Sequence, residues 1–152
     1  MRARNTRPTG RQGTCFAAPA PSPIANSDGL DFHTLVPCRV LDTRNPDGPL
    51  GGPALSAGAI RTFVIAGQCG IPSSAQSVAV NLTVTEPTSG GYLTVYSAGS
   101  PISLASRINF GAGQTRANNA VVTLGPSGDI EVTSGQPSGT VHFILDAAGY
   151  FQ

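Results

Sequence analysis

Apolar and polar residues alternate strictly along several stretches of this chain. Between positions 78 and 84, valine or leucine occupies every even position, and alanine, asparagine or threonine occupies the odd positions. A period of two with β-branched residues predicts a half-buried antiparallel strand, here over residues 76–85. Similar runs predict further strands at residues 35–42, 60–66, 92–96, 104–110, 120–124, 129–133 and 140–145.

The residues between these runs are turn formers, since the chain contains 19 glycines and 13 prolines. We expect residues 86–91 to form a hairpin turn between the strands 76–85 and 92–96, and residues 126–129 to form a second hairpin turn. No long stretch has the apolar period of a helix. The sequence therefore predicts an all-β fold, an antiparallel β-sandwich of about eight strands that is immunoglobulin-like or jelly-roll-like.

The N-terminal part of the chain differs from the rest in charge and in proline content. Residues 1–27 contain four arginines, four prolines and no acidic residue, with few large apolar side chains. Such a segment buries too little surface to fold by itself. We expect residues 1–33 to form a basic, Pro-rich extended arm and residues 34–152 to form the β-sandwich domain.

One segment of this arm has its own period of two. Its prolines stand at positions 19, 21 and 23, whereas the subunit-docking candidates Phe16, Ala18, Ala20 and Ile24 stand at even positions. An extended chain directs alternate N–H groups to opposite sides, so these prolines remove donors from one side only. The segment is suited to pair with one sheet edge and to block pairing on its outer side. The alternative is a polyproline linker that is merely extended.

The overall composition excludes two classes of partner. Charged residues make up 11% of the chain and the net charge is +1, so there is no basic field for nucleic acid. The longest apolar run is only a few residues, far below the roughly 20 that a bilayer requires. We expect neither nucleic-acid binding nor a membrane span.

The chain contains three cysteines, Cys15, Cys38 and Cys69. A bridge between Cys38 and Cys69 would close a loop of about 30 residues and contribute roughly 3–4 kcal/mol of stability. Two buried thiols are the alternative. With the bridge formed, Cys15 is left over in the arm, either free or bonded to a neighbouring subunit.

No residue pattern in the chain predicts catalysis or a metal centre. A catalytic histidine requires a nucleophile and an orienting acid, and neither His33 nor His142 stands in such a motif. Residues 42–48 are rich in oxygen ligands but lack the spacing of a calcium loop, so a turn with hydrogen bonds between Asp42 and Arg44 is favoured. Asn81 opens an Asn-Leu-Thr sequon and is a candidate glycan attachment site. We expect no enzymatic activity, no cofactor and no metal ion.

Several charged residues stand where loops meet strands. Arg116 lies in the polar stretch 113–119, which leads into an apolar strand, and Asp146 follows the last apolar run. Ion pairs and charge-assisted hydrogen bonds at such places hold loops together. We expect Asp42, Arg44, Arg116 and Asp146 to form a structural polar cluster across one end of the sandwich, whose mutation lowers stability.

Six motifs together resemble a known type of domain. They are residues 32–44 (FHTLVPCRVLDTR), 48–50 (GPL), 67–72 (GQCGIP), 78–84 (VAVNLTV), 108–110 with 113–118, and 145–151 (LDAAGYF). The pattern resembles an uncharacterised all-β domain that recurs in large secreted and cell-surface proteins of environmental bacteria, and the likeness covers about residues 32–151. The resemblance implies an extracellular, non-catalytic sandwich with a Cys38–Cys69 bridge and structural roles for Asp42, Arg44 and Arg116.

These inferences favour a structural role for the protein. We expect a subunit of an extracellular bacterial filament or surface assembly, joined head-to-tail because the arm docks as a strand on a neighbouring subunit. The partner is then the protein itself, as a homopolymer. The alternative is a carbohydrate-binding or adhesive cell-surface module, with Tyr92, Tyr96 and Tyr150 as candidate sugar-stacking residues. An exposed pair of tyrosines in a groove would favour that alternative.

Overall fold

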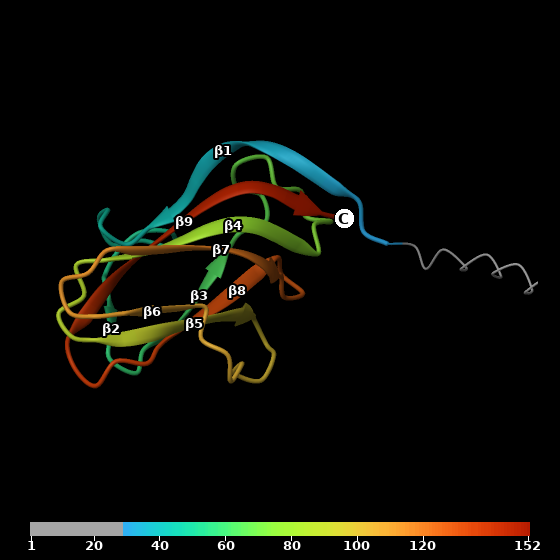
Figure 1. The fold of residues 1–152 in the computed structure, drawn as a ribbon. Coiled ribbons are helices and arrows are strands. Elements are labelled where there is room, and N and C mark those ends of the chain that lie inside the picture. The colour runs from blue at the N-terminus through green and yellow to red at the C-terminus, as the bar shows by residue number, and fades with distance from the viewer. Residues whose placement is uncertain (1–28) are drawn as a thin grey trace, which may run out of the picture.

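The computed structural model describes residues 29–152, which fold as nine β-strands (Figure 1). The strands are β1 (Phe32–Asp42), β2 (Leu55–Ser56), β3 (Ile60–Val64), β4 (Ser77–Thr85), β5 (Gly91–Ser97), β6 (Ile108–Phe110), β7 (Arg116–Thr123), β8 (Asp129–Ser134) and β9 (Thr140–Phe151). Within the described range no helix is present, and so none is long and apolar enough to cross a membrane.

The strands form two antiparallel sheets that pack face to face. One sheet has the order β1-β9-β4-β7, with the short β2 paired to the start of β9, and the other has the order β3-β8-β5-β6. Leaving β2 aside, the first strand pairs with the last, the second with the second-last, and so on inward to β5 and β6. This is a long antiparallel hairpin rolled into two sheets, the topology of a jelly roll.

The all-β sandwich predicted from the sequence is confirmed, and the topology selects the jelly roll over the immunoglobulin-like alternative. The two predicted hairpins are wrong. β4 pairs with β7 and β9, whereas β5 pairs with β6 and β8, so the turn at residues 86–91 crosses from one sheet to the other. The turn at residues 126–129 likewise connects β7 to β8 of the opposite sheet.

The core lies between the two sheets and is built from the predicted apolar positions. On β4 the residues Val78, Leu82 and Val84 are fully buried. Phe63 of β3 and Phe143 of β9 meet across the core, with ring centroids 6.3 Å apart. Burying one such side chain stabilises the fold by roughly 2–3 kcal/mol. The alternation of apolar and polar residues thus correctly predicts which face of the strand packs into the core.

The strands β1 and β9 extend beyond the ends predicted from the sequence, because each continues as far as its pairing partner does. β1 begins at Phe32, two residues before the expected start of the domain, because backbone hydrogen bonds of 2.8 and 3.2 Å join Asp31 to Gln152. The Phe32 ring packs on Phe151 at 4.9 Å, directly over Gly149, where a Cβ would lie 2.5 Å from that ring. β9 accordingly extends to Phe151, six residues beyond the predicted end at residue 145.

Candidate functional site

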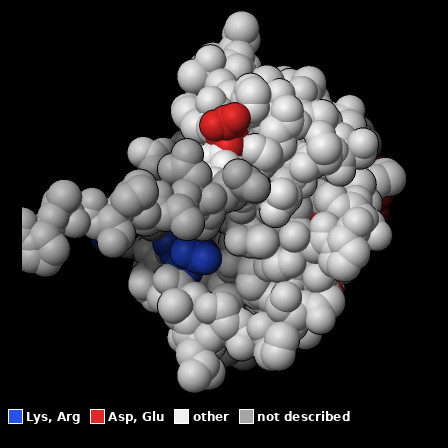
Figure 2. All heavy atoms as spheres, turned by 90° about the vertical axis from the view of Figure 1, so that its right-hand side faces the viewer, with Lys and Arg blue, Asp and Glu red and all other residues white. Residues whose placement is uncertain are grey.

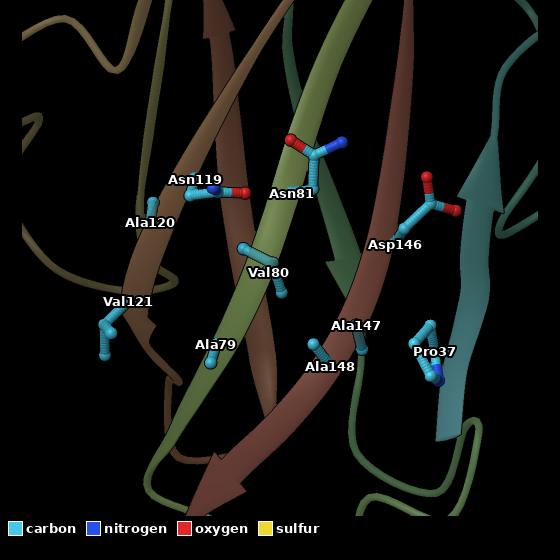
Figure 3. A pocket seen from close by; sticks show the side chains of 10 residues that line it. All are labelled: Pro37, Ala79, Val80, Asn81, Asn119, Ala120, Val121, Asp146, Ala147 and Ala148. Atoms are coloured by element: carbon cyan, nitrogen blue, oxygen red, sulfur yellow. The ribbon is translucent and has the colours of Figure 1, made fainter. Parts of the chain in front are cut away.

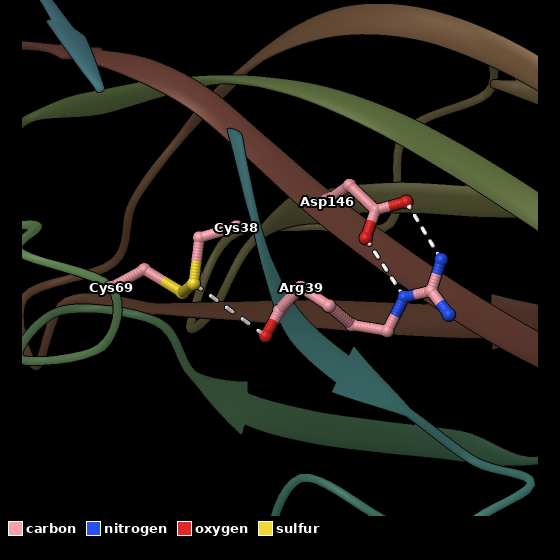
Figure 4. Close-up of a disulfide and its surroundings, with 4 residues drawn as sticks. All are labelled: Cys38, Arg39, Cys69 and Asp146. Carbon is pink, nitrogen blue, oxygen red and sulfur yellow. Dashed lines mark hydrogen bonds and ion pairs between the residues drawn. A yellow bond between two sulfur atoms is a disulfide. The ribbon is translucent and has the colours of Figure 1, made fainter. Parts of the chain in front are cut away.

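A disulfide fixes the β1 edge of the five-stranded sheet. Cys38 of β1 is bonded to Cys69, which lies in the connection between β3 and β4, at a sequence separation of 31 residues (Figure 4). The turn that presents Cys69 has positive φ at Gly67, Cys69 and Gly70, so two of its three left-handed positions are glycines. The predicted bridge is present, and the alternative of two free thiols is excluded. Cys15 lies outside the described residues.

A network of four charged residues lies directly beside the disulfide. Arg39 Nε and Nη2 donate to the two carboxylate oxygens of Asp146 at 2.9 and 3.2 Å, as Figure 4 shows. Arg39 Nη1 also contacts Asp42 Oδ2 at 3.3 Å. Asp42 in turn accepts hydrogen bonds from Arg44 Nε at 2.9 Å and Nη2 at 2.6 Å. The network therefore connects β1 to β9 and to the loop that follows β1.

Asp42 is the buried member of this network, because its side chain is only 5% exposed. The Arg44 guanidinium lowers the pKa of that carboxyl to about 2, and the Arg44 backbone N–H, 3.0 Å from Oδ1, adds to the effect. Arg39 and Arg44 remain half-exposed, at 50% and 42%. Charge-assisted hydrogen bonds of this kind hold the end of β1 to the loop that follows it.

The predicted polar cluster is therefore assembled with one different member. Asp42, Arg44 and Asp146 are connected as expected, but the connecting residue is Arg39. Arg116 lies at the start of β7, exposed, on the opposite edge of the same sheet. The reason is register: Asp146 faces Arg39 on one side and Asn81 on the other, whereas Arg116 faces Val84. Only the pairing of β1 with β9, which is remote in sequence, reveals Arg39.

The two histidines have ordinary structural contacts. His33 stacks on Tyr150, with ring centroids 4.9 Å apart. His142 Nδ1 lies 3.1 Å from the Thr43 hydroxyl, which also accepts the N–H of Phe143 at 2.8 Å. Thr43 is buried, with only 1% of its surface exposed. Among the described residues no group of three His, Cys, Asp or Glu is placed to hold a metal ion.

The outer face of the five-stranded sheet is hollowed into a shallow trough of about 550 Å³ (Figure 3). Its floor is low because outward positions on the two central strands are alanines, Ala79 of β4 and Ala148 of β9. Pro37 of β1 stands on one side and Val121 of β7 on the other. We call this surface the alanine trough. An apolar depression of this kind suits contact with another apolar chain segment.

The polar side chains of the alanine trough form a row across the sheet. Asp146, Asn81 and Asn119 face one another in register on β9, β4 and β7. Asp146 is held by Arg39, and the Asn81 amide donates to Thr83 Oγ1 at 3.4 Å. Asn81 thus lies on a central strand within the trough, and its glycosylation stays a prediction.

Of the three tyrosines only Tyr92 is exposed. Tyr92 is 44% exposed and lines a groove of about 290 Å³ with Ile102 and Leu104. Tyr96 is buried and its hydroxyl lies 3.2 Å from Thr133 Oγ1, while Tyr150 packs on His33 and the core. The three rings therefore provide no exposed pair for stacking on a sugar.

Comparison with known proteins adds little to this description. No family model matches the chain, and no curated protein matches it significantly. Among solved structures, the Tobacco streak virus coat protein, determined as a dimer, is similar with a TM-score of 0.41 and 12% identity over 80% of this chain and 86% of that chain. A likeness of this size assigns no function to the chain.

Proposed function

We propose that the protein is a structural subunit of an extracellular bacterial filament or surface assembly. Residues 16–24 of one subunit dock as an added strand on the next, so that the subunits join head-to-tail. Lending a strand in this way gives an open polymer when the rotation between neighbours does not close. The docking residues Phe16, Ala18, Ala20 and Ile24 lie outside the described residues.

The observation that carries this proposal is that the described residues supply both sheets and the core between them. The fully buried side chains come from both sheets and form one continuous cluster within residues 40–147. The first strand of the fold is already paired to β9 from Phe32 onward. Side chains of the described residues therefore form the core, and the proposal assigns residues 16–24 to a neighbour.

The place where the arm leaves the domain also supports the proposal. Asp31 is hydrogen-bonded to Gln152, so the arm joins the domain beside the C-terminus, at one end of the sandwich (Figure 1). Figure 2 views that end, and the part of its surface that is not drawn in grey shows few charged side chains. A weakly charged end allows close approach of a second copy of the domain.

The disulfide supports an extracellular location. The Cys38–Cys69 bond persists in oxidising compartments and is rare in reducing ones. It also agrees with the secreted character that the sequence motifs imply.

Two pairs of proline substitutions in the arm test the proposal. Ala18→Pro/Ala20→Pro removes N–H donors from the side of the segment that is expected to pair. Ala17→Pro/Ala25→Pro adds the same two prolines at positions of the opposite parity, where the donors are not used. Sedimentation velocity of the full chain is expected to give large polymers for the wild type and the second variant, and 15.4 kDa monomers for the first. Polymers of equal size from both variants would contradict strand docking.

The carbohydrate-binding alternative retains one specific observation, the half-exposed Tyr92 in its groove. A glycan array with wild-type protein and Tyr92→Ala tests it. Binding that disappears in the variant, from a protein that stays monomeric, would favour the alternative over the structural role.

A further inference from the structure

The two sheets differ in how their edge strands are protected. Antiparallel sheets expose unpaired N–H and C=O groups at each edge, and proteins usually shorten, bend, charge or cover such edges. In the described part of the chain the long sheet ends at β1 and β7, and the other sheet ends at β3 and β6. Three of these four edges carry such protection.

The protection of the three edges is specific. β1 is interrupted by Pro37, by a register shift between Thr34 and Cys38, and by the disulfide. β6 is only three residues long. On β3 the Arg61 guanidinium donates to backbone carbonyls of residues 51–53, which holds that loop beside the strand.

β7 is neither short nor interrupted, and its side-chain contact with a loop is a single hydrogen bond, from Asn118 Nδ2 to the Arg107 carbonyl at 2.7 Å. It is eight residues long, contains neither proline nor glycine, carries a single charge at its first residue, and among the described residues pairs only with β4. Almost all of its residues are exposed, including Val121 at 53%. Val121 and Asn119 also line the alanine trough, so the free edge and the apolar surface are adjacent.

We infer that the edge of β7 is the acceptor for residues 16–24 of a second copy of this chain. This inference rests on the proposed function and adds the place at which the arm docks. The nine residues 16–24 match the eight residues of β7 in length, and their apolar even positions suit the uncharged surface beside Val121. Antiparallel addition continues the pairing that every other strand of the sheet uses.

The register of the sheet makes antiparallel docking of the arm on its own molecule difficult. Phe32, Phe151, Ser77 and Thr123 lie in one row, so the arm leaves its own domain at the Thr123 end of the sheet. Antiparallel docking on the same molecule would place residue 24 near Arg116, about 30 Å from Phe32 across the sheet. Eight residues span at most about 28 Å when fully extended. A second molecule removes this constraint.

Lysine substitutions on two edge strands test the acceptor. Ala117→Lys/Val121→Lys places two charges four residues apart on β7. Ile60→Lys/Val64→Lys places the same charges at the same spacing on β3, where Ile60 and Val64 are 53% and 50% exposed. We expect the β7 variant to be monomeric at concentrations at which the wild type and the β3 variant are polymeric.

Mixing two variants that cannot polymerise by themselves tests directly whether the arm binds the β7 edge. The β7 variant retains its arm, and Ala18→Pro/Ala20→Pro retains its β7 edge, so together they are expected to form a dimer that does not grow. A mixture that stays monomeric, with each variant folded by circular dichroism, would overturn the inference.

Hydrogen exchange provides a readout that needs no acceptor variant. Amides of residues 116–123 are expected to exchange at least ten-fold more slowly in wild-type polymers than in Ala18→Pro/Ala20→Pro monomers. Equal exchange in both would place the arm on another surface, and so would polymerisation of the β7 variant. Both results would leave the proposed function standing, whereas a monomeric wild type would remove both proposals.

Discussion

The two edges of the five-stranded sheet are built in opposite ways. At β1 a disulfide, a buried carboxylate and two arginines hold the edge strand to the rest of the molecule. At β7 the edge strand is long, exposed and nearly uncharged. Both edges belong to the same sheet, yet β1 contributes to the stability of the subunit, whereas β7 is the edge that we infer to accept another chain. Substitutions should therefore affect stability at β1 and assembly at β7.

The largest expected effect on stability comes from the disulfide at the β1 edge. Cys38→Ser/Cys69→Ser should lower the free energy of unfolding by about 3–4 kcal/mol, because the bond closes a loop of 31 residues in the unfolded chain. Chemical denaturation of the variant measures the loss, and Cys15→Ser serves as the control that retains the bond. Equal midpoints for the two variants would show that the disulfide does not constrain this edge.

The next effect comes from Asp42 and depends on pH. Its pKa is about 2 in the folded protein, below the ordinary 3.8, so the ionised carboxylate contributes stability above pH 4 that is lost as the pH falls toward 2. This difference between the two pKa values corresponds to about 2 kcal/mol in the free energy of unfolding. Denaturation of the wild type and of Asp42→Asn between pH 2 and 5 measures it. The variant should be less stable at pH 5 and should lose less on acidification; parallel curves would contradict the role of Asp42.

The smallest expected changes in stability come from replacing one arginine at each edge. Arg39→Ala breaks a half-exposed pair with Asp146 and should cost about 0.5–1 kcal/mol. Arg116→Ala, at the exposed start of β7, should change stability by less than about 0.5 kcal/mol. Thermal unfolding of both variants checks this order. A larger loss for Arg116→Ala would mean that the cluster includes the β7 edge after all.

Local patterns in the sequence identified most of the strands and the core. The alternation around Val80 and Leu82 predicted β4 because burial of one face is a local property of a strand. The hairpins were wrong because the partner of each strand is decided by the rolling of the chain, in which β1 pairs with β9 across the whole domain. The start of β7 was missed because its residues are polar and its strand conformation comes from pairing with β4.

For the candidate sites too, contacts between residues close in sequence could be predicted, and contacts between distant residues could not. The Asp42–Arg44 contact is local, two residues apart, and could be predicted from the loop sequence. Arg39 could not be identified, because its partner Asp146 is 107 residues away and only the β1–β9 register joins them. The alanine trough was not predicted either, because it arises from alanines on separate strands that only the sheet order brings together.

Negative-stain electron microscopy of the full-length protein, beside a variant that lacks residues 1–28, tests whether the arm joins the subunits. The truncation retains Asp31 and its bonds to Gln152, so the domain keeps its first strand pairing. Filaments are expected from the full-length protein and single particles from the truncated one. Single particles from both, or filaments from both, would contradict assembly through the arm.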